Sequence, residues 1–344
     1  MSSVASLTLI SQQFTIYFGI PVFFFGLIGN CLNILMFLSK NLFPSSPCQL
    51  YFLTASISSL IAIIIPLSLR ILIGLQYDLT KTNLFLCKSR QYLGHVSILA
   101  SLTCVSLATI DRYLISCREV RFRQMSKIST ARILCILTIV FWSLHGLPIV
   151  IMVNIYPAAA NQTVCVNRSI IYGYYLNYFI ILILYNILPL AIFILFGLLT
   201  WRNMHKIQRR RIEPQQQQQQ QRLPTTQRQE YQLTKMLLLQ ISSISISTIP
   251  YAINTLYNTI TSQIQKDSLR TAQENLSTTV TNFLFYLNFA VSFYIYLISS
   301  KSLRKKFFRK FLSTYSGCKQ VTHAISTITA PTANNLDRTT TRNN

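Results

Sequence analysis

The stretch LFLCKSRQYLGHVSILASLTCVSLATIDRY, residues 84–113, has the pattern that decides the fold of this chain. It is apolar over most of its length, with Cys87 in its first turn and Asp111-Arg112-Tyr113 at its end. As an α-helix it places Cys87 about 37 Å from Arg112, since each residue adds about 1.5 Å. A lipid bilayer with its interfacial regions is about 40–45 Å thick. The stretch therefore predicts a membrane-spanning helix with the cysteine at one face and the arginine at the other.

The charged end of this stretch has two interpretations. A charge at the centre of a membrane helix costs roughly 2.5–3.5 kcal/mol, so charges near the lipid usually have a function. Asp111 and Arg112 would then form a functional pair. Alternatively, Asp111-Arg112-Tyr113 only marks the interface at which the helix leaves the lipid. The rest of the chain has to decide between the two.

The composition of the whole chain indicates a protein that crosses the bilayer several times. Of its 344 residues, 51% are hydrophobic and 11% are charged, whereas soluble proteins have about 25% charged residues. The net charge of +23 would suit nucleic acid, but its distribution does not. Of the 31 Lys and Arg residues, 24 lie around Lys40 and in segments 112–132, 202–235 and 301–342. This asymmetry follows the positive-inside rule, which places Arg112 on the cytoplasmic side and argues against a nucleic-acid partner.

Seven apolar segments are long enough to cross the bilayer, since about 20 apolar residues span its core as a helix. The predicted spans are 14–38, 48–73, 84–113, 131–153, 171–201, 232–260 and 278–299. Together they predict an all-α membrane protein, a seven-transmembrane helix bundle that covers residues 14–300. Residues 1–13 precede it as a short extracellular N-terminus.

The segments on the basic side differ from the spans in composition. Residues 202–230 form a Gln-rich loop with seven consecutive Gln at 215–221, which predicts a flexible cytoplasmic linker. Residues 301–312 alternate basic and apolar side chains at helical spacing, which predicts a short amphipathic eighth helix on the membrane surface. The tail 313–344 is rich in Thr and Asn and is expected to be disordered. Its Cys318 is either a palmitoylation site or a free thiol.

The opposite side has three sequences that fit the N-glycosylation pattern, at Asn161, Asn167 and Asn275. All three agree with the topology that the charge distribution predicts. The compartment on that side permits a disulfide. Cys87 and Cys165 are the cysteines that lie outside the lipid there, so we expect them to be bonded. The eight cysteines include no CxxC pair, so we expect no metal site.

Individual residues within the spans complete a recognisable set. They are Gly29-Asn30 in the first span, Cys87 and Asp111-Arg112-Tyr113 in the third, Trp142 in the fourth, Pro189 in the fifth, Pro250 in the sixth and Tyr296 in the seventh. With these residues the chain resembles the rhodopsin-like (class A) G-protein-coupled receptors over roughly residues 14–318. The resemblance implies a plasma-membrane receptor that has no cofactor and is not an enzyme. Such a receptor binds an extracellular ligand and activates a heterotrimeric G protein by outward movement of the sixth helix.

The resemblance also implies which residues switch the receptor between its resting and active states. They are Asp111, Arg112, Tyr113 and Tyr296. Glu230 lies 20 residues before Pro250, or about 30 Å along a helix, which puts it at the cytoplasmic end. There Glu230 either pairs with Arg112 and holds the third span to the sixth, or is a solvated residue of a charged linker.

Several positions of the family pattern differ in this chain. The family's second-span aspartate and seventh-span asparagine help to hold a sodium ion, and the aligned residues here are Ser59 and Ser292. A cation would meet only neutral oxygens between them, so we do not expect a sodium site. The sixth-span tryptophan is replaced by Thr248, and the fifth-span tyrosine by Gly197. The activation trigger must therefore differ in detail.

The ligand is constrained mainly by what is missing. Receptors for amines have a third-span aspartate where this chain has Gly94, and opsins have a seventh-span lysine where it has Tyr286. The residues expected to line the outer cavity, each of which could instead only pack or snorkel, are Arg70, Arg90, Gln91, His95, Tyr251, Asn282 and Tyr286. Such a polar, aromatic and mildly basic mouth suits a peptide or an anionic small molecule better than an amine, and we predict a peptide.

Other function classes fit the sequence less well. A transporter would show internal repeats or interrupted helices around a midplane ion site, and the sequence shows neither. An enzyme would need a nucleophile–base or metal-ligand constellation, which is also missing. A non-signalling scavenger or partner receptor fits the altered sixth and seventh spans. Intact Asp111-Arg112-Tyr113 and the basic inner loops favour signalling.

Overall fold

The computed structural model describes residues 2–39, 46–157, 163–212 and 225–299, together with Arg304, Lys305 and Phe307. Side chains at residue 2, at 206–212 and at 225–231 are outside this description. The chain divides into two units, Met1–Ser300 and Lys301–Asn344. The predicted eighth helix, 301–312, falls almost entirely outside the described residues, as does Cys318.

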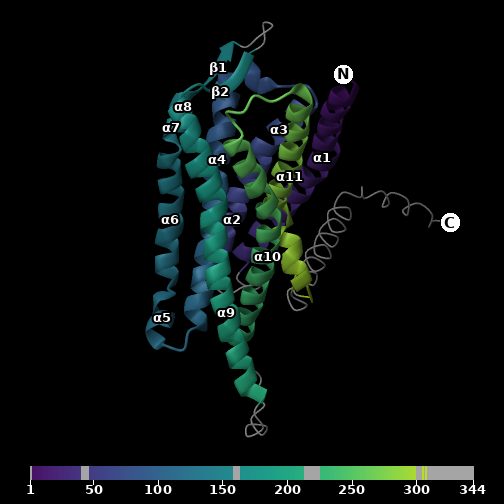
Figure 1. Ribbon diagram of the computed structural model, residues 1–344. Helices are drawn as coiled ribbons and strands as arrows, with labels where there is room; N and C mark the ends of the chain where they lie inside the picture. Colours follow the sequence, from purple (N-terminus) through teal and green to yellow (C-terminus); the bar gives the residue numbers. More distant parts are fainter. Residues whose placement is uncertain are drawn as a thin grey trace, which may run out of the picture. The chain divides into compact units, whose positions relative to one another are not determined.

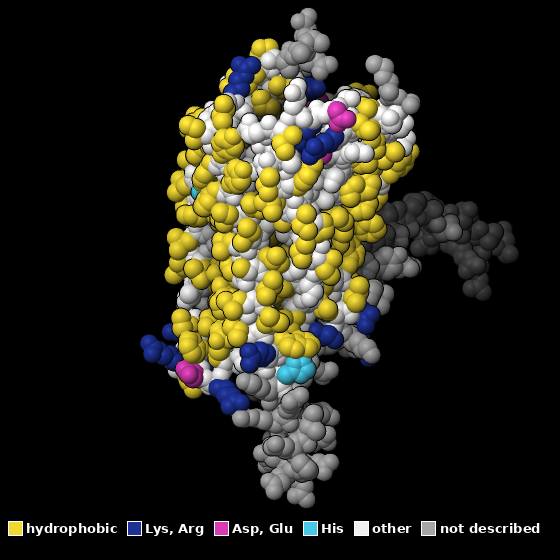
Figure 2. Space-filling view, in the orientation of Figure 1, with side chains coloured by type: hydrophobic (Ala, Val, Ile, Leu, Met, Phe, Trp, Pro, Cys, Tyr) yellow, Lys and Arg dark blue, Asp and Glu magenta, His cyan; other side chains and the backbone are white. Residues whose placement is uncertain are grey.

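Seven helical segments in the described residues are long and apolar enough to cross a membrane. They run side by side as a bundle (Figure 1). A belt of hydrophobic side chains covers the middle of the bundle, and most of the exposed Lys and Arg side chains lie towards its ends (Figure 2). The segments are Ser3–Leu38, Pro47–Gly74, Leu84–Ser116, Ile128–Met152, Ile170–His205, Gln232–Ile260 and Ser268–Ser299. The predicted seven-helix fold is therefore confirmed.

Several spans are built from more than one helical element. The first four spans and the segments between them comprise α1 (Ser2–Leu38), α2 (Pro47–Ala62), η1 (Ile63–Leu67), α3 (Ser68–Gly74), η2 (Leu79–Lys81), α4 (Leu84–Ser116), α5 (Val120–Met125), α6 (Ile128–His145) and α7 (Leu147–Met152). The last three spans comprise α8 (Ile170–Tyr174), η3 (Tyr175–Ile187), α9 (Leu188–Ile212), α10 (Thr225–Ile260) and α11 (Ser268–Ser299). The segments η1 and η3 are π-helical, and η2 is a single 3₁₀ turn.

Helix starts and irregular turns follow from the local sequence. Ser46 and Gln49 form a reciprocal capping box at the start of α2. The Asn83 side chain accepts a hydrogen bond from a backbone N–H in the first turn of α4. Pro66 lies within η1, where its missing N–H removes one helical hydrogen bond. In η3, the Asn186 amide donates to a backbone carbonyl of the same segment.

Helix α4 is the most buried of the seven spans. Of its most apolar stretch, 72% is buried within the protein, against 28–50% for the other six. It packs against α2, α6 and α9, while α11 packs against α1 and α10. The indole N–H of Trp142 in α6 donates to Thr103 Oγ1 in α4 at 2.9 Å. The stretch at 84–113 therefore forms the central helix of the bundle.

Between α7 and α8 the chain forms an antiparallel β hairpin that the sequence did not predict. Strand β1 (Val153–Pro157) pairs with β2 (Thr163–Asn167), with Ile155 opposite Cys165. The predicted disulfide is confirmed, since Cys165 is bonded to Cys87 with Cα atoms 5.8 Å apart. The bond fixes the hairpin to the first turn of α4. We call this end of the bundle the hairpin end and the opposite end the Arg112 end.

Three helices begin at least seven residues earlier than the hydropathy pattern predicts. Helix α1 begins at Ser2 rather than at residue 14, α10 at Thr225 rather than at 232, and α11 at Ser268 rather than at 278. Since α9 also continues to Ile212, the two ends of the predicted linker 202–230 are helical. Hydropathy marks the part of a helix that lies in lipid, whereas these extra turns are partly polar. The Asp267 carboxylate accepts a hydrogen bond from the Arg270 N–H at 3.0 Å and caps α11. The predicted glycosylation residue Asn275 consequently lies within α11, with its side chain exposed.

The hydrogen bond between Trp142 and Thr103 gives a stability prediction. Thr103→Val keeps the shape of the side chain but leaves the largely buried indole N–H without its acceptor. We expect a loss of about 1 kcal/mol, which lowers the Tm of the purified protein by about 2–4 °C. Thr103→Ser retains the hydroxyl and is the matched control. Equal Tm values for the Val and Ser variants would show that this bond does not stabilise the bundle.

Candidate functional site

The predicted switch residues Asp111 and Arg112 form an ion pair at the end of α4. Arg112 is 1% exposed, and one terminal guanidinium nitrogen lies 2.6 Å from Asp111 Oδ2. The second oxygen, Asp111 Oδ1, accepts a hydrogen bond from Ser126 Oγ, which follows α5. A buried charge is tolerated when it is paired and hydrogen-bonded. This geometry fits a functional pair better than a simple marker of the interface.

Neighbouring residues connect the end of α4 to the fifth span. The ring of Tyr113 lies 5.4 Å from that of Phe196 in α9, centroid to centroid. The Asn203 amide of α9 donates to Ser116 Oγ at 3.1 Å. Glu230 belongs to α10 by its backbone, but its side chain is outside the described residues. Its pairing with Arg112 therefore stays a prediction.

Tyr296 connects the seventh span to the sixth at the same end. Its hydroxyl donates to Gln240 Oε1 of α10, and the side chain is 2% exposed. Its ring also contacts Phe37 of α1 and Phe52 of α2, with centroids 5.8 and 5.4 Å away. A shift of α10 relative to α11 must therefore break or rearrange the Tyr296–Gln240 bond.

A small, partly polar cavity lies between α2, α4, α10 and α11, beside the Ser59 and Ser292 positions at which the resemblance raised a sodium ion. Its lining includes Ser59, Ser101, Gln240, Asn288 and Ser292, and no carboxylate is among the described residues that line it. The hydroxyls of Ser59 and Ser101 are hydrogen-bonded at 2.9 Å. The volume open to the centre of a water molecule is about 10 Å³, which corresponds to roughly one water. The volume would admit either a water molecule or a sodium ion, but the described lining offers only neutral oxygens and no carboxylate to balance the charge of a cation.

The residues that replace family positions have polar partners within the bundle. Thr248, at the tryptophan position, accepts a hydrogen bond from the Asn288 amide at 3.2 Å. Ser292, at the asparagine position, accepts one from the Asn33 amide at 2.9 Å. Asn30 of the first span donates to a backbone carbonyl of α11 at 2.8 Å. The interior is therefore held by neutral hydrogen bonds between helices.

Two of the predicted ligand residues meet at the hairpin end. Arg70 of α3 and Arg90 of α4 line a cavity of about 400 Å³ whose other walls come from α1, η2 and α11. Cavities of about 300–1,000 Å³ are typical of ligand sites. Tyr286 lies within electrostatic range of both guanidinium groups. The two basic residues of the predicted ligand site, Arg70 and Arg90, thus line the same cavity.

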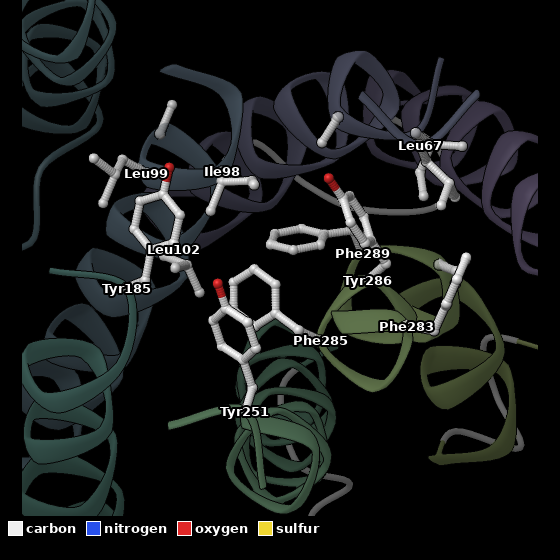
Figure 3. Close-up of a cluster of buried hydrophobic side chains, with 14 of the residues drawn as sticks. Leu67, Ile98, Leu99, Leu102, Tyr185, Tyr251, Phe283, Phe285, Tyr286 and Phe289 are labelled. Atoms are coloured by element: carbon white, nitrogen blue, oxygen red, sulfur yellow. The ribbon is translucent and has the colours of Figure 1, made fainter. Parts of the chain in front are cut away.

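The two predicted tyrosines belong to the hydrophobic core beside this cavity. Tyr251 and Tyr286 are 9% and 8% exposed and pack in one cluster with Phe285 and Tyr185. Figure 3 shows the Tyr251 and Phe285 rings against each other, with their centroids 4.7 Å apart. Neither tyrosine is among the residues that line the 400 Å³ cavity. They belong to the core and do not form the wall of this cavity.

The three remaining predicted residues do not line this cavity. His95 is buried, and its Nε2 lies 3.0 Å from His145 Nδ1 in α6. The Asn282 amide donates to the carbonyl of Thr278 within α11. Gln91 is exposed. The periodicity placed these residues on the correct helices, but the rotation of each helix, which packing sets, points them elsewhere.

The sequence reasoning missed the contribution of the first helix to this cavity. Ser11, Gln12 and Thr15 line it from α1, although residues 1–13 were expected to precede the helix. Asp78 and Lys81 line it from the turn around η2. An available signal was the absence of Gly and Pro from residues 2–18, which permits a helix to continue beyond the lipid.

The predicted glycosylation residues have different surroundings. Asn275 is exposed on α11. The Asn167 amide donates to the carbonyl of Ser169 at 3.1 Å. Asn161 is outside the described residues. Glycosylation at all three stays a prediction.

The lack of a carboxylate in the described lining of the interior cavity predicts that sodium does not stabilise this protein. A bound ion stabilises the folded state by mass action, by about 2.7 kcal/mol at one hundred times its Kd. We expect the same Tm when sodium is replaced by potassium or N-methylglucamine at constant ionic strength. Ser59→Asp places a carboxylate in this cavity and should make the Tm rise with sodium. A sodium-specific rise in Tm for the unmodified chain would contradict this interpretation of the cavity.

Comparison with known proteins agrees with this arrangement. No curated protein matches the chain at a significant level. A model of the family "7 transmembrane receptor (rhodopsin family)" matches residues 29–296, which include the disulfide, the Asp111–Arg112 pair and Tyr296. That match covers most of the chain. The chain therefore belongs to the rhodopsin family of seven-transmembrane receptors, a non-enzymatic class of multi-pass plasma-membrane receptors that couple to G proteins.

Proposed function

We propose that this receptor binds a peptide at the hairpin end and activates a heterotrimeric G protein at the Arg112 end. The hairpin end would face the outside of the cell, together with the N-terminus. Activation would move α10 away from α4, so that Arg112 changes its partners. The observation that carries this proposal is the nearly complete burial of the Arg112 guanidinium against Asp111.

The contacts around Arg112 support a two-state switch. Asp111 is held in place from a second element, by the hydroxyl of Ser126. Tyr296 and Gln240 form a buried bond between α11 and α10 at the same end. A buried charge and a buried hydrogen bond each need a partner in both states. Packed helices therefore change between discrete arrangements rather than continuously.

The preference for a peptide rests on the hairpin end. The cavity there is polar, has a net positive lining and lacks the acidic residue of α4 that would pair with an amine, since that position is Gly94. The hairpin is fixed to α4 by the disulfide and presents further polar backbone close by. Extended peptides bind such sites through many polar contacts.

The switch predicts opposite effects for two substitutions at the Arg112 end. Arg112→Ala should reduce G-protein activation at matched surface expression without abolishing ligand binding, because the released guanidinium is the group that the G protein would meet. Glu230→Ala should raise basal signalling by up to about fivefold, since a partly hydrated ion pair is worth about 1 kcal/mol. The measurement is basal and stimulated activation of a panel of Gα subunits in transfected cells, with peptide, amine and lipid libraries as stimuli.

Arg132→Ala is the matched control, because Arg132 is an exposed arginine near the Arg112 end of α6. It should leave both basal and stimulated signalling unchanged. Normal signalling by Arg112→Ala together with unchanged basal activity of Glu230→Ala would contradict the switch. Binding of a peptide without activation of any Gα subunit would instead identify a scavenger or partner receptor.

A further inference from the structure

The 400 Å³ cavity at the hairpin end has an excess of positive charge. Its lining includes Arg70, Lys81 and Arg90 as cations and Asp78 as a carboxylate. The formal charge of the lining is therefore 3 − 1 = +2. Clefts lined mainly by one sign of charge focus the field and concentrate ions of the opposite sign.

Arg70 and Arg90 come from different helices and lie close enough to repel each other. Both side chains are half-buried. Among the described residues, no carboxylate lies within 4.0 Å of either guanidinium group. Two like charges held together in a partly dry site are unfavourable unless an anion joins them.

The acid that lies nearby is already engaged. Asp78 is within electrostatic range of Arg90. Its Oδ1 accepts hydrogen bonds from the backbone N–H and the hydroxyl of Thr80, at 3.1 and 2.5 Å. Its Oδ2 lies 4.0 Å from the Lys81 ammonium. Asp78 therefore shapes the turn around η2, and the two guanidinium groups have no carboxylate partner among the described residues, although Arg70 lies 6.0 Å from the Phe283 ring centroid.

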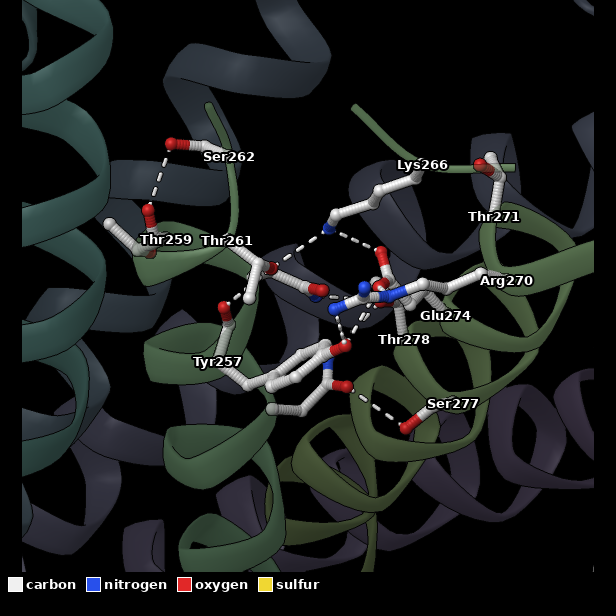
Figure 4. Close-up of polar contacts among 12 residues, drawn as sticks. Tyr257, Thr259, Thr261, Ser262, Lys266, Arg270, Thr271, Glu274, Ser277 and Thr278 are labelled. Atoms are coloured by element: carbon white, nitrogen blue, oxygen red, sulfur yellow. Dashed lines mark hydrogen bonds and ion pairs between the residues drawn. The ribbon is translucent and has the colours of Figure 1, made fainter. Parts of the chain in front are cut away.

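Two other cations at this end show how the protein pairs a charge that it uses structurally. The Lys266 ammonium lies 2.5 Å from Glu274 Oε2, and Arg270 Nε lies 3.1 Å from Glu274 Oε1 (Figure 4). The Tyr257 hydroxyl donates to the same carboxylate at 2.9 Å. Here the chain provides its own anion between α10 and α11. Between Arg70 and Arg90 it does not.

We propose that this cavity binds a carboxylate of the receptor's ligand between Arg70 and Arg90, an assignment that rests on the proposed peptide-receptor function. The planar guanidinium groups match a carboxylate through paired N–H···O bonds. The C-terminal carboxylate of a peptide, or an acidic side chain, has this chemistry. Because Arg70 belongs to α3 and Arg90 to α4, the bound carboxylate joins the second span to the third.

The charge of the cavity is testable without knowing the ligand. Gln12 lines the cavity and Gln273 lines the hollow beside the paired Glu274 cluster. Single cysteines are introduced as Gln12→Cys or Gln273→Cys into the purified full-length receptor, with Cys31, Cys117 and Cys318 replaced by Ser. Each thiol is reacted with methanethiosulfonate reagents that carry a sulfonate or a trimethylammonium group. The anionic-to-cationic rate ratio should be about tenfold or more higher at Gln12→Cys.

Substitution of the two arginines provides the control. Arg70→Gln with Arg90→Gln should lower the ratio at Gln12→Cys to that at Gln273→Cys. Lys88→Gln removes a charge from the same helix at a residue that does not line the cavity, and it should leave the ratio unchanged. Equal ratios at the two cysteines, or a ratio that does not respond to the arginine substitutions, would overturn the proposal.

A second measurement tests binding itself. N-acetylglycine, which has a carboxylate, should slow the reaction of Gln12→Cys with the neutral methyl methanethiosulfonate. N-acetylglycinamide should not slow it, and the arginine substitutions should remove the protection. Protection by neither compound, or by sulfate but not by N-acetylglycine, would overturn a carboxylate site. Neither measurement involves a G protein. Failure of the carboxylate site can therefore be distinguished from failure of the proposed signalling function.

Discussion

The ion pair between Arg112 and Asp111 places a full charge inside the end of the most buried helix. Its two side chains are 0% and 5% exposed, with nitrogen and oxygen 2.6 Å apart. Buried pairs of this kind seldom add net stability, because removing both charges from water costs as much as their attraction returns. Such a pair is expected to be retained when one of its residues has a function in a second conformation, as we propose for Arg112. Around the pair, Ser126 donates to Asp111, and Tyr296 donates to Gln240 between α11 and α10.

The described contacts between α10 and α11 are concentrated at the hairpin end. The Asn254 and Asn258 amides both donate to Thr278, and the Tyr257 hydroxyl donates to Glu274. Further along the two helices, the Asn288 amide donates to Thr248, and the Tyr296 hydroxyl donates to Gln240. Bonds concentrated at the hairpin end are compatible with the proposed outward movement of α10 at the Arg112 end.

The sequence predicted the features of the fold that the bilayer determines, namely the positions of the spans and the side on which each loop lies. Apolar length located all seven spans, and the sidedness of the charges left Cys87 and Cys165 as the disulfide partners. The start of α11 at Ser268 was not predicted, because helical turns outside the lipid lack the long apolar run that identifies a membrane span. The hairpin was not predicted either, because it is held by a disulfide to α4, which is distant in sequence. Facing directions within the site were the least predictable, because the rotation that turns His95 towards α6 is set by packing among several helices.

Movement of α10 away from the centre of the bundle is the central claim, and a distance between spin labels tests it most directly. Labels at Lys235 on α10 and Arg132 on α6 lie on exposed positions towards the Arg112 end. Double electron–electron resonance would compare the purified receptor alone with the receptor bound to each member of a panel of nucleotide-free G-protein heterotrimers. We predict that at least one heterotrimer adds a longer-distance population. An unchanged distance distribution, with a receptor that still catalyses nucleotide exchange on that G protein, would contradict the claim.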